Sequence, residues 1–198
     1  MLTPQAEALA AEGFHVIWYD RRGTGVEQNV DDAAQILREV GPAAVIGFSS
    51  GGVIALALAL AVRHPVDRVV AWEPPALGML PDGLATHAAL LAPIEAHLAE
   101  HPGDWAGAFR VMTTDPAMLA NAELAIRSDA RLITKHRFDP GELPADRTVI
   151  AVSRSVNPIL AAVAERLGDP VVVDDADDHE VYLKRPEVLA AWYKKSQS

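Results

Sequence analysis

An apolar run leads into a glycine-flanked pair of serines at Ala43-Ala44-Val45-Ile46-Gly47-Phe48-Ser49-Ser50-Gly51-Gly52. The run has the character of a strand, and the Ala- and Leu-rich residues 53–62 that follow have the character of a helix. A Gly-x-Ser-x-Gly pattern between a strand and a helix is typical of a nucleophile turn, whose tight bend needs small residues on both sides of the serine. The start of the helix also directs backbone N–H groups towards the place where an oxyanion would form. Ser49 is therefore the candidate nucleophile and the Ser50 N–H a candidate oxyanion donor; the plainer alternative is that one of them only caps the helix.

The composition limits the classes of protein that fit the chain. Half of the 198 residues are apolar, which is enough for one domain with a sizeable core. The formal net charge of −10 disfavours nucleic acid or an anionic membrane surface as a partner. The sequence contains no cysteine, which excludes a disulfide, a thiolate zinc site and a cysteine nucleophile. No signal peptide and no membrane-spanning run are recognised, so we expect a soluble, cytoplasmic protein.

Helix-like and strand-like segments alternate on both sides of the serine turn. A helix over 4–12 is followed by a strand over Phe14–Tyr19 and by a helix that ends near Val40, with Asn29 as its cap. Further strands are predicted over 66–72, 148–152 and 170–173, and Asn157 with Pro158 begins the helix that precedes the last of them. This alternation predicts an α/β fold, a three-layer sandwich with a parallel sheet of about five strands.

Residues 76–147 interrupt the alternation. Their apolar residues recur at helical spacing, and no strand is predicted among them. A helical insertion between strands predicts a cap or lid over the carboxyl edge of the sheet, where the sites of α/β proteins lie. We therefore expect a core made of residues 1–75 and 148–198, with a cap over 76–147.

With these segments placed, the chain resembles the α/β-hydrolase superfamily over nearly its whole length. The resemblance rests on four sequence features that each follow a predicted strand: Tyr19-Asp20-Arg21-Arg22-Gly23, Gly47-Phe48-Ser49-Ser50-Gly51-Gly52, Glu73-Pro74-Pro75 and His179. The chain is most similar to the proline-iminopeptidase-like and esterase-like branch with a helical cap. The resemblance implies a Ser–His–acid triad, an acyl-serine intermediate and a small-molecule substrate with an ester or similar acyl bond. We expect neither a cofactor nor a metal, and the sequence does not indicate an oligomeric state.

The base and the acid of such a triad can be sought among the residues that follow strands. Of the seven histidines, only His179 follows the last predicted strand, and it would take the proton of Ser49. The strand after the insertion leads into residues 153–157, which contain no carboxylate, although the acid follows this strand in many such hydrolases. Glu73 stands one strand earlier and is our preferred acid; an incomplete triad, or an aspartate from 174–178, stays open.

The resemblance does not extend to one strand and loop that the superfamily has before its first helix. In this superfamily a strand ending in a His-Gly type loop precedes the first helix and supplies a second oxyanion donor, and the chain begins at that helix. We therefore expect a shortened hydrolase or a chain whose true start lies upstream, and a direct pairing of Phe14–Tyr19 with the Ala43–Phe48 strand. Two other functions stay open: a non-catalytic, hydrolase-like protein that binds a ligand, and a nucleotide-binding domain built on the glycines at 47, 51 and 52 with Glu73 as the ribose acid.

Overall fold

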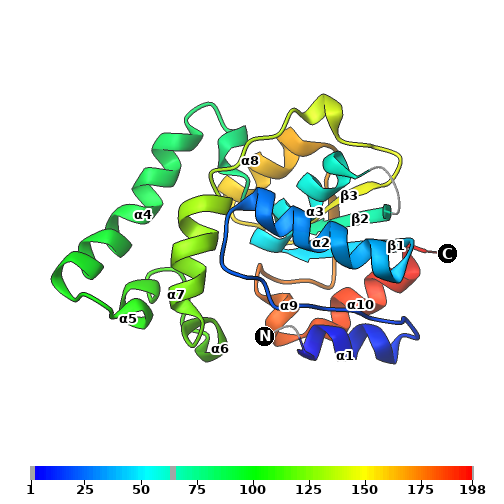
Figure 1. The fold of residues 1–198 in the computed structure, drawn as a ribbon, viewed down its shortest axis with the longest axis horizontal. Coiled ribbons are helices and arrows are strands. Elements are labelled where there is room, and N and C mark those ends of the chain that lie inside the picture. Colours follow the sequence, from blue (N-terminus) through cyan, green and yellow to red (C-terminus); the bar gives the residue numbers. More distant parts are fainter. Residues whose placement is uncertain (1–2, 63–65, 198) are drawn as a thin grey trace.

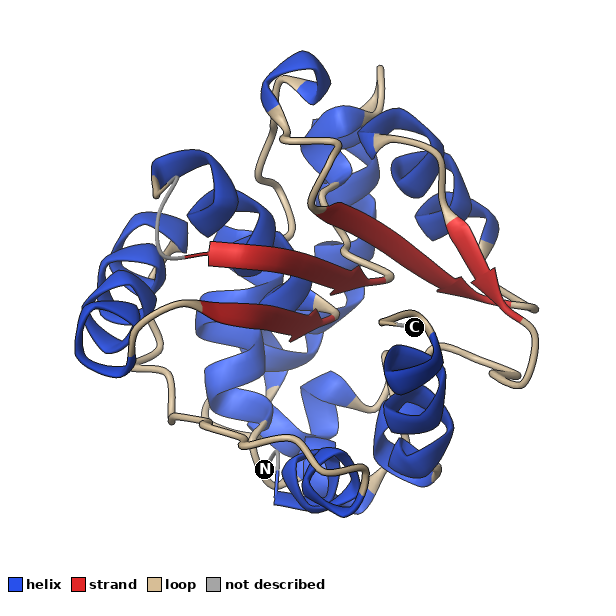
Figure 2. Ribbon diagram, turned by 90° about the vertical axis from the view of Figure 1, so that its right-hand side faces the viewer, coloured by secondary structure: helices blue, strands red, loops and turns tan. Residues whose placement is uncertain are grey.

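The computed structural model describes residues 3–62 and 66–197, and its centre is a parallel sheet (Figures 1 and 2). The sheet contains β1 (Ala43–Phe48), β2 (Val66–Trp72), β3 (Thr148–Ser153) and β4 (Val171–Val173), side by side in the order of the sequence. Each neighbouring pair is parallel. The α/β fold class is confirmed, with four strands in the described part of the chain where about five were expected.

Helices cover both faces of the sheet because successive strand residues point to opposite sides. In β2, Val69 and Ala71 join the apolar cluster on one face, whereas Val70 and Trp72 join the cluster on the other. The first face packs against α2 (Val26–Val40), α3 (Ser50–Ala61) and α8 (Pro158–Leu167). The second packs against α1 (Thr3–Ala11), α9 (Val181–Lys184) and α10 (Pro186–Lys195). Figure 1 shows the resulting three layers, with α1 on the face opposite α2.

The prediction of a strand over Phe14–Tyr19 is wrong. This segment is irregular chain that does not pair with β1, and a cavity of about 1360 Å³ is lined by both. The chain is anchored at Phe14, whose ring lies 5.2 Å from the ring of Tyr193, and just beyond the segment at Arg21, which is bound to Asp129. A strand is stable only with a hydrogen-bonded neighbour, and these anchors keep the segment away from the edge of β1.

The sequence predicted an asparagine cap at the start of two helices. The cap is present at α8 and absent at α2. Asn157 accepts a hydrogen bond from Ile159 N at 2.8 Å, so the cap predicted for α8 is confirmed. Asn29 does not cap α2, which begins at Val26 after Gly25. Its side-chain amide lies inside the helix and donates to Gly25 O at 2.8 Å. α2 therefore starts without a side-chain cap, and Asn29 bonds the loop that precedes the helix.

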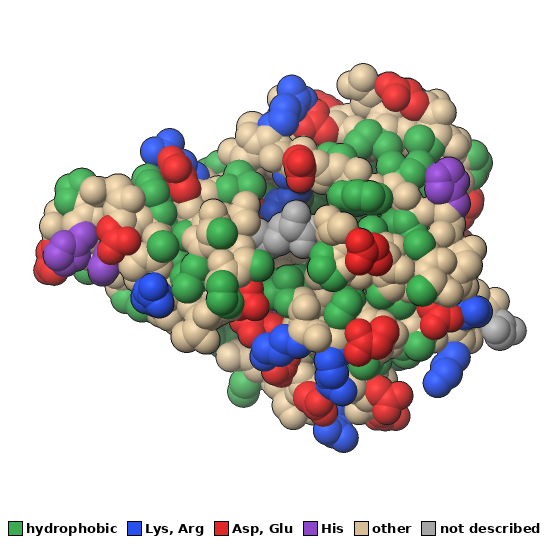
Figure 3. All heavy atoms as spheres, turned by 90° about the horizontal axis from the view of Figure 1, so that it is seen from below, with side chains coloured by type: hydrophobic (Ala, Val, Ile, Leu, Met, Phe, Trp, Pro, Cys, Tyr) green, Lys and Arg blue, Asp and Glu red, His purple; other side chains and the backbone are tan. Residues whose placement is uncertain are grey.

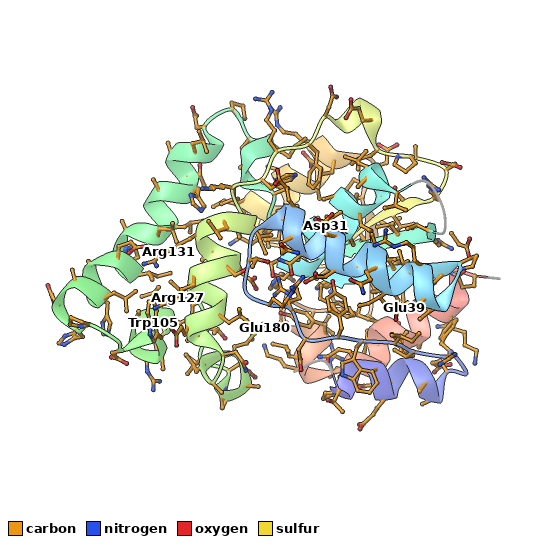
Figure 4. All side chains as sticks on the ribbon, viewed as in Figure 1. Asp31, Glu39, Trp105, Arg127, Arg131 and Glu180 are labelled. Carbon is orange, nitrogen blue, oxygen red and sulfur yellow. The ribbon has the colours of Figure 1, made fainter. Side chains whose placement is uncertain are left out.

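Residues 76–147 are here called the helical insertion. Its middle part, residues 83–124, projects to one side of the sheet (Figure 1), whereas Leu77, Phe138 and Leu143 near its two ends pack in the main core. The described elements of the insertion are helices, with no strand among them: η1 (Leu77–Met79), α4 (Gly83–Glu100), α5 (Trp105–Phe109), α6 (Pro116–Leu119), α7 (Ala122–Leu124), the π-helix η2 (Ala125–Ile133) and η3 (Pro140–Glu142). The insertion has its own apolar cluster around Ile94, Phe109 and Ile126. Figure 4 shows Arg127 and Arg131 beside Trp105, and the Arg127 guanidinium lies 4.8 Å from the centre of that ring.

The face that carries α1, α9 and α10 mixes basic and acidic side chains (Figure 3). Several of them form ion pairs across this face, such as Lys194 with Glu12 at 3.0 Å and Lys184 with Asp178 at 2.9 Å. Exposed pairs of this kind contribute little to stability individually. Among the described residues, no helix combines the length and apolar character that a membrane span requires.

Candidate active site

Ser49 forms the bend between β1 and α3. Its backbone has φ of 51° and ψ of −124°, a left-handed conformation that is costly for a residue with a side chain. The bend is held because Ser49 N donates to Trp72 O at 2.9 Å. It also requires glycine at position 47, where a Cβ atom would lie 2.2 Å from the carbonyl oxygen of Gly51. The first glycine of the motif therefore has a steric reason: strand and helix approach too closely for any other residue at position 47.

Glu73 and His179 meet at the carboxyl edge of the sheet. His179 Nδ1 donates to Glu73 Oε2 at 2.7 Å, and the indole Nε1 of Trp72 holds the backbone of His179 at 3.0 Å. The Glu73 side chain is fully buried. Its backbone has φ of 38°, and among the described non-glycine residues only Ser49 shares a positive φ. Strained backbone tends to be retained at functional sites, and here both strained residues belong to the predicted site.

Ser153 fixes the other oxygen of the Glu73 carboxylate. Its backbone N–H and its hydroxyl donate to Glu73 Oε1 at 2.7 Å and 2.5 Å. Burial disfavours the charged form of Glu73 and tends to raise its pKa, but the hydrogen bonds from His179 and Ser153 outweigh burial. The pKa of Glu73 therefore lies below its usual value of 4.5, and the carboxylate is ionised at neutral pH.

We expect Ser153→Ala to destabilise the protein by roughly 1–3 kcal/mol at pH 7, the value of a hydrogen bond to a buried charge. A folded-state pKa below the usual value means that ionised Glu73 stabilises the fold above about pH 4.5, and that this contribution is lost as the pH falls. The deficit of Ser153→Ala relative to wild type should therefore be full at pH 7 and shrink below pH 4.5. Thermal melting from pH 7 to pH 3 measures it, with the exposed neighbour Ser155→Ala as the control. A deficit independent of pH would contradict the assigned role of Ser153.

The sequence-predicted residues lie around one space. Ser49, Ser50 and His179 all line the cavity of about 1360 Å³, together with apolar residues of the core and of the helical insertion. Glu73 stands behind His179 and occupies Nδ1 of its ring, which leaves Nε2 for another partner. In the described part of the chain, Ser49 and His179 do not form a direct hydrogen bond with each other. The arrangement has a buried acid, an imidazole oriented by it and a strained serine on the same cavity.

Two aspartates of the turn before His179 form ion pairs at the surface. Asp177 pairs with Arg154 at 2.6 Å and also with Arg185, and Asp178 pairs with Lys184. Within residues 3–62 and 66–197, no group of three or more His, Asp or Glu side chains has an arrangement that could hold a metal ion. The geometry therefore brings Glu73 to His179 and ties these aspartates to surface cations.

Sequence reasoning missed an ion pair beside the serine turn. Arg21 makes two hydrogen bonds to Asp129, at 2.9 Å and 2.8 Å, and Ser50 Oγ donates to Asp129 Oδ2 at 2.7 Å. Burial disfavours the charge of Arg21, but the bonds to Asp129 and its charge outweigh burial, so the pKa of Arg21 is raised. Arg21 stood in a quoted motif without a role, and nothing around Asp129 in the sequence marked it. Ser153 was missed too, although its place at the end of β3 was a usable signal.

Comparison with known proteins agrees with this architecture. A model of the alpha/beta hydrolase family matches residues 2–194, and the chain therefore belongs to that family. The structure is similar to that of the putative non-heme bromoperoxidase BpoC from Mycobacterium tuberculosis H37Rv, with a TM-score of 0.65 and 18% identity over 96% of this chain and 83% of that chain. An alpha/beta hydrolase from Sphaerobacter thermophilus has a TM-score of 0.62 and 21% identity over 98% of this chain and 88% of its own. At such identities the likeness to these structures describes the fold.

Proposed function

We propose that the protein is a serine hydrolase that cleaves an ester or a similar acyl bond through an acyl-serine intermediate. Ser49 attacks the carbonyl carbon, His179 takes the serine proton at Nε2 and later returns it to the leaving group, and Glu73 holds the imidazole in the required tautomer. The N–H of Ser50 stabilises the oxyanion. The observation that carries this proposal is the Glu73–His179 hydrogen bond of 2.7 Å beside a serine held at a φ of 51°.

The helical insertion has the position of a cap in this proposal. Its residues Met112 and Met118 line the same cavity as Ser49, and Glu180, next to His179, accepts a hydrogen bond from Thr113 of the insertion at 2.8 Å. Figure 4 shows Glu180 between the insertion and the core. An insertion tied down beside the imidazole would limit the access of water to the acyl-enzyme and shape the pocket for the substrate.

Covalent labelling with a fluorophosphonate probe tests the proposal, because the probe reacts only with a serine whose nucleophilicity is raised by a neighbouring base. We expect one adduct, located on Ser49 by peptide mass spectrometry, and none after heat denaturation. An adduct on another residue would refute the assignment of the nucleophile. Absence of any adduct would favour the alternative, a hydrolase-like protein that uses the same cavity only to bind a ligand.

A further inference from the structure

The ion pair beside the serine turn joins three parts of the chain that are distant in sequence. Arg21 belongs to the irregular segment before α2, Asp129 to the π-helix η2 of the insertion, and Ser50 is the first residue of α3. Asp129 accepts two bonds from Arg21 and one from Ser50, so both of its oxygens are satisfied. The side chains of Arg21 and Asp129 are 24% and 22% exposed, which places the pair at the wall of the cavity. A two-bonded Arg–carboxylate pair with little exposure has a fixed geometry.

Other contacts hold the same two segments together. Ser128, the neighbour of Asp129, is buried and its hydroxyl donates to Thr24 O at 2.6 Å. A Cβ atom on Gly23, whose φ is 74°, would lie 2.6 Å from Leu124 of the insertion. The π-helix η2 carries Ser128 and Asp129 on wider turns, with Thr134 N bonded to Asp129 O five residues back. Short π-helical stretches occur frequently at functional sites.

Ser50 has a special place because it follows the proposed nucleophile. As the first residue of α3, its backbone N–H has no acceptor within the helix and is free to bind an oxyanion. A serine hydroxyl at a helix start readily bonds to nearby backbone groups instead. Its donation to Asp129 prevents this, and keeps a second hydroxyl from competing for the site beside Ser49.

We propose that Arg21 and Asp129 are positioning residues. Asp129 accepts a hydrogen bond from the hydroxyl of Ser50, and through this bond the ion pair fixes the oxyanion donor and holds the helical insertion over the serine turn. This inference rests on the proposed function, in which the Ser50 N–H stabilises the oxyanion. Neither Arg21 nor Asp129 is required to touch the substrate. The pair acts through Ser50, so its loss should slow the chemical step more than it weakens substrate binding.

Steady-state hydrolysis of an aryl ester by four variants tests this role. We expect Asp129→Ala to lower kcat roughly 10- to 100-fold, since small displacements near reacting atoms cost about that much, with KM changed far less. Ser50→Ala keeps the backbone N–H and should lose about ten-fold, as expected for one side-chain hydrogen bond. The double variant should be no slower than Asp129→Ala, because both changes break one connection. Arg22→Gln is the matched control: it removes the adjacent Arg22–Asp32 pair, which does not contact Ser50, and should retain wild-type rates.

A kcat for Asp129→Ala within two-fold of wild type, a change confined to KM, or additive losses in the double variant would overturn the inference. Wild-type protein that is neither active nor labelled would refute the proposed function, and the positioning role is then judged without turnover. For this, ¹⁵N relaxation of the Ser50 and Gly51 amides is compared between variants. Loss of order in Asp129→Ala but not in Arg22→Gln supports the role, and unchanged order in both overturns it.

Discussion

Replacing Ser49 by alanine is expected to lower kcat/KM for an aryl ester by about 10⁴-fold or more, the loss seen when a nucleophile acts together with its base. In the proposed mechanism the attack falls to Ser49, and the strained turn and the cavity shared with His179 support this role. The adjacent Ser50 donates its hydroxyl to Asp129 and is not available for attack. Hydrolysis of p-nitrophenyl acetate, followed by absorbance, measures the loss.

The adjacent serine supplies the matched control for this experiment. Ser50→Ala should lose only about ten-fold under the same conditions, because it removes one side-chain hydrogen bond and no nucleophile. Equal losses in the two variants, or a loss below ten-fold for Ser49→Ala, would show that the nucleophile is elsewhere.

Replacing Glu73 by glutamine is expected to lower kcat by roughly 10³- to 10⁴-fold, through a wrong tautomer of the imidazole. Two donors from Ser153 face the Oε1 position of residue 73, so they would hold the amide oxygen there. The amide NH₂ would then face His179 Nδ1 and leave the ring proton on Nε2, where it blocks transfer from Ser49. The loss is measured on the same ester, with folding checked by circular dichroism.

Asp178→Asn is the control for Glu73→Gln because it changes a carboxylate of the turn next to His179. Asp178 pairs with Lys184 at the surface, so we expect its replacement to alter kcat by less than two-fold. Similar and mild losses in both variants would mean that Glu73 is not the acid.

The position of Glu73, the proposed acid, illustrates how neighbouring strands share a site. Glu73 directly follows β2 and Ser153 ends β3, and the register pairs Trp72 with Ala151 at the same edge. The side chain after one strand therefore reaches the end of the next. In this chain Ser153 occupies the end of β3, where many hydrolases of this type place the acid, and it donates two hydrogen bonds to the carboxylate supplied by β2.

The outer edge of β1 faces the cavity and has no neighbouring strand among the described residues. Within the described residues, β1 is hydrogen-bonded only to β2, and the cavity lies along its other side. Backbone N–H and C=O groups on that side face the cavity instead of a strand, which leaves them available to water or to a ligand. This cavity is larger than a direct pairing with Phe14–Tyr19 would have allowed, and it extends from the serine turn to Leu9 and Phe14.

Local sequence patterns were sufficient for the parallel strands, most helices and the serine turn. Apolar runs in β1 and β2, the glycines around Ser49 and the Asn157-Pro158 cap each act over a few residues, so their conformations follow from local chemistry. The parallel order of the strands also predicts that Glu73 and His179 lie at one edge of the sheet. Their contact was therefore predictable from the ends of strands.

Contacts between distant segments were decided by the tertiary structure alone. Phe14–Tyr19 has the composition of a strand but no neighbour to pair with, because packing on Tyr193 and the bond from Arg21 to Asp129 hold the chain elsewhere. The ion pair itself joins residues 108 positions apart, and no local pattern records such a meeting. Turns and caps depend on their own residues, so the sequence by itself determined them. Strand pairing and ion pairs between distant segments depend on where the rest of the chain lies, so only the tertiary structure decided them.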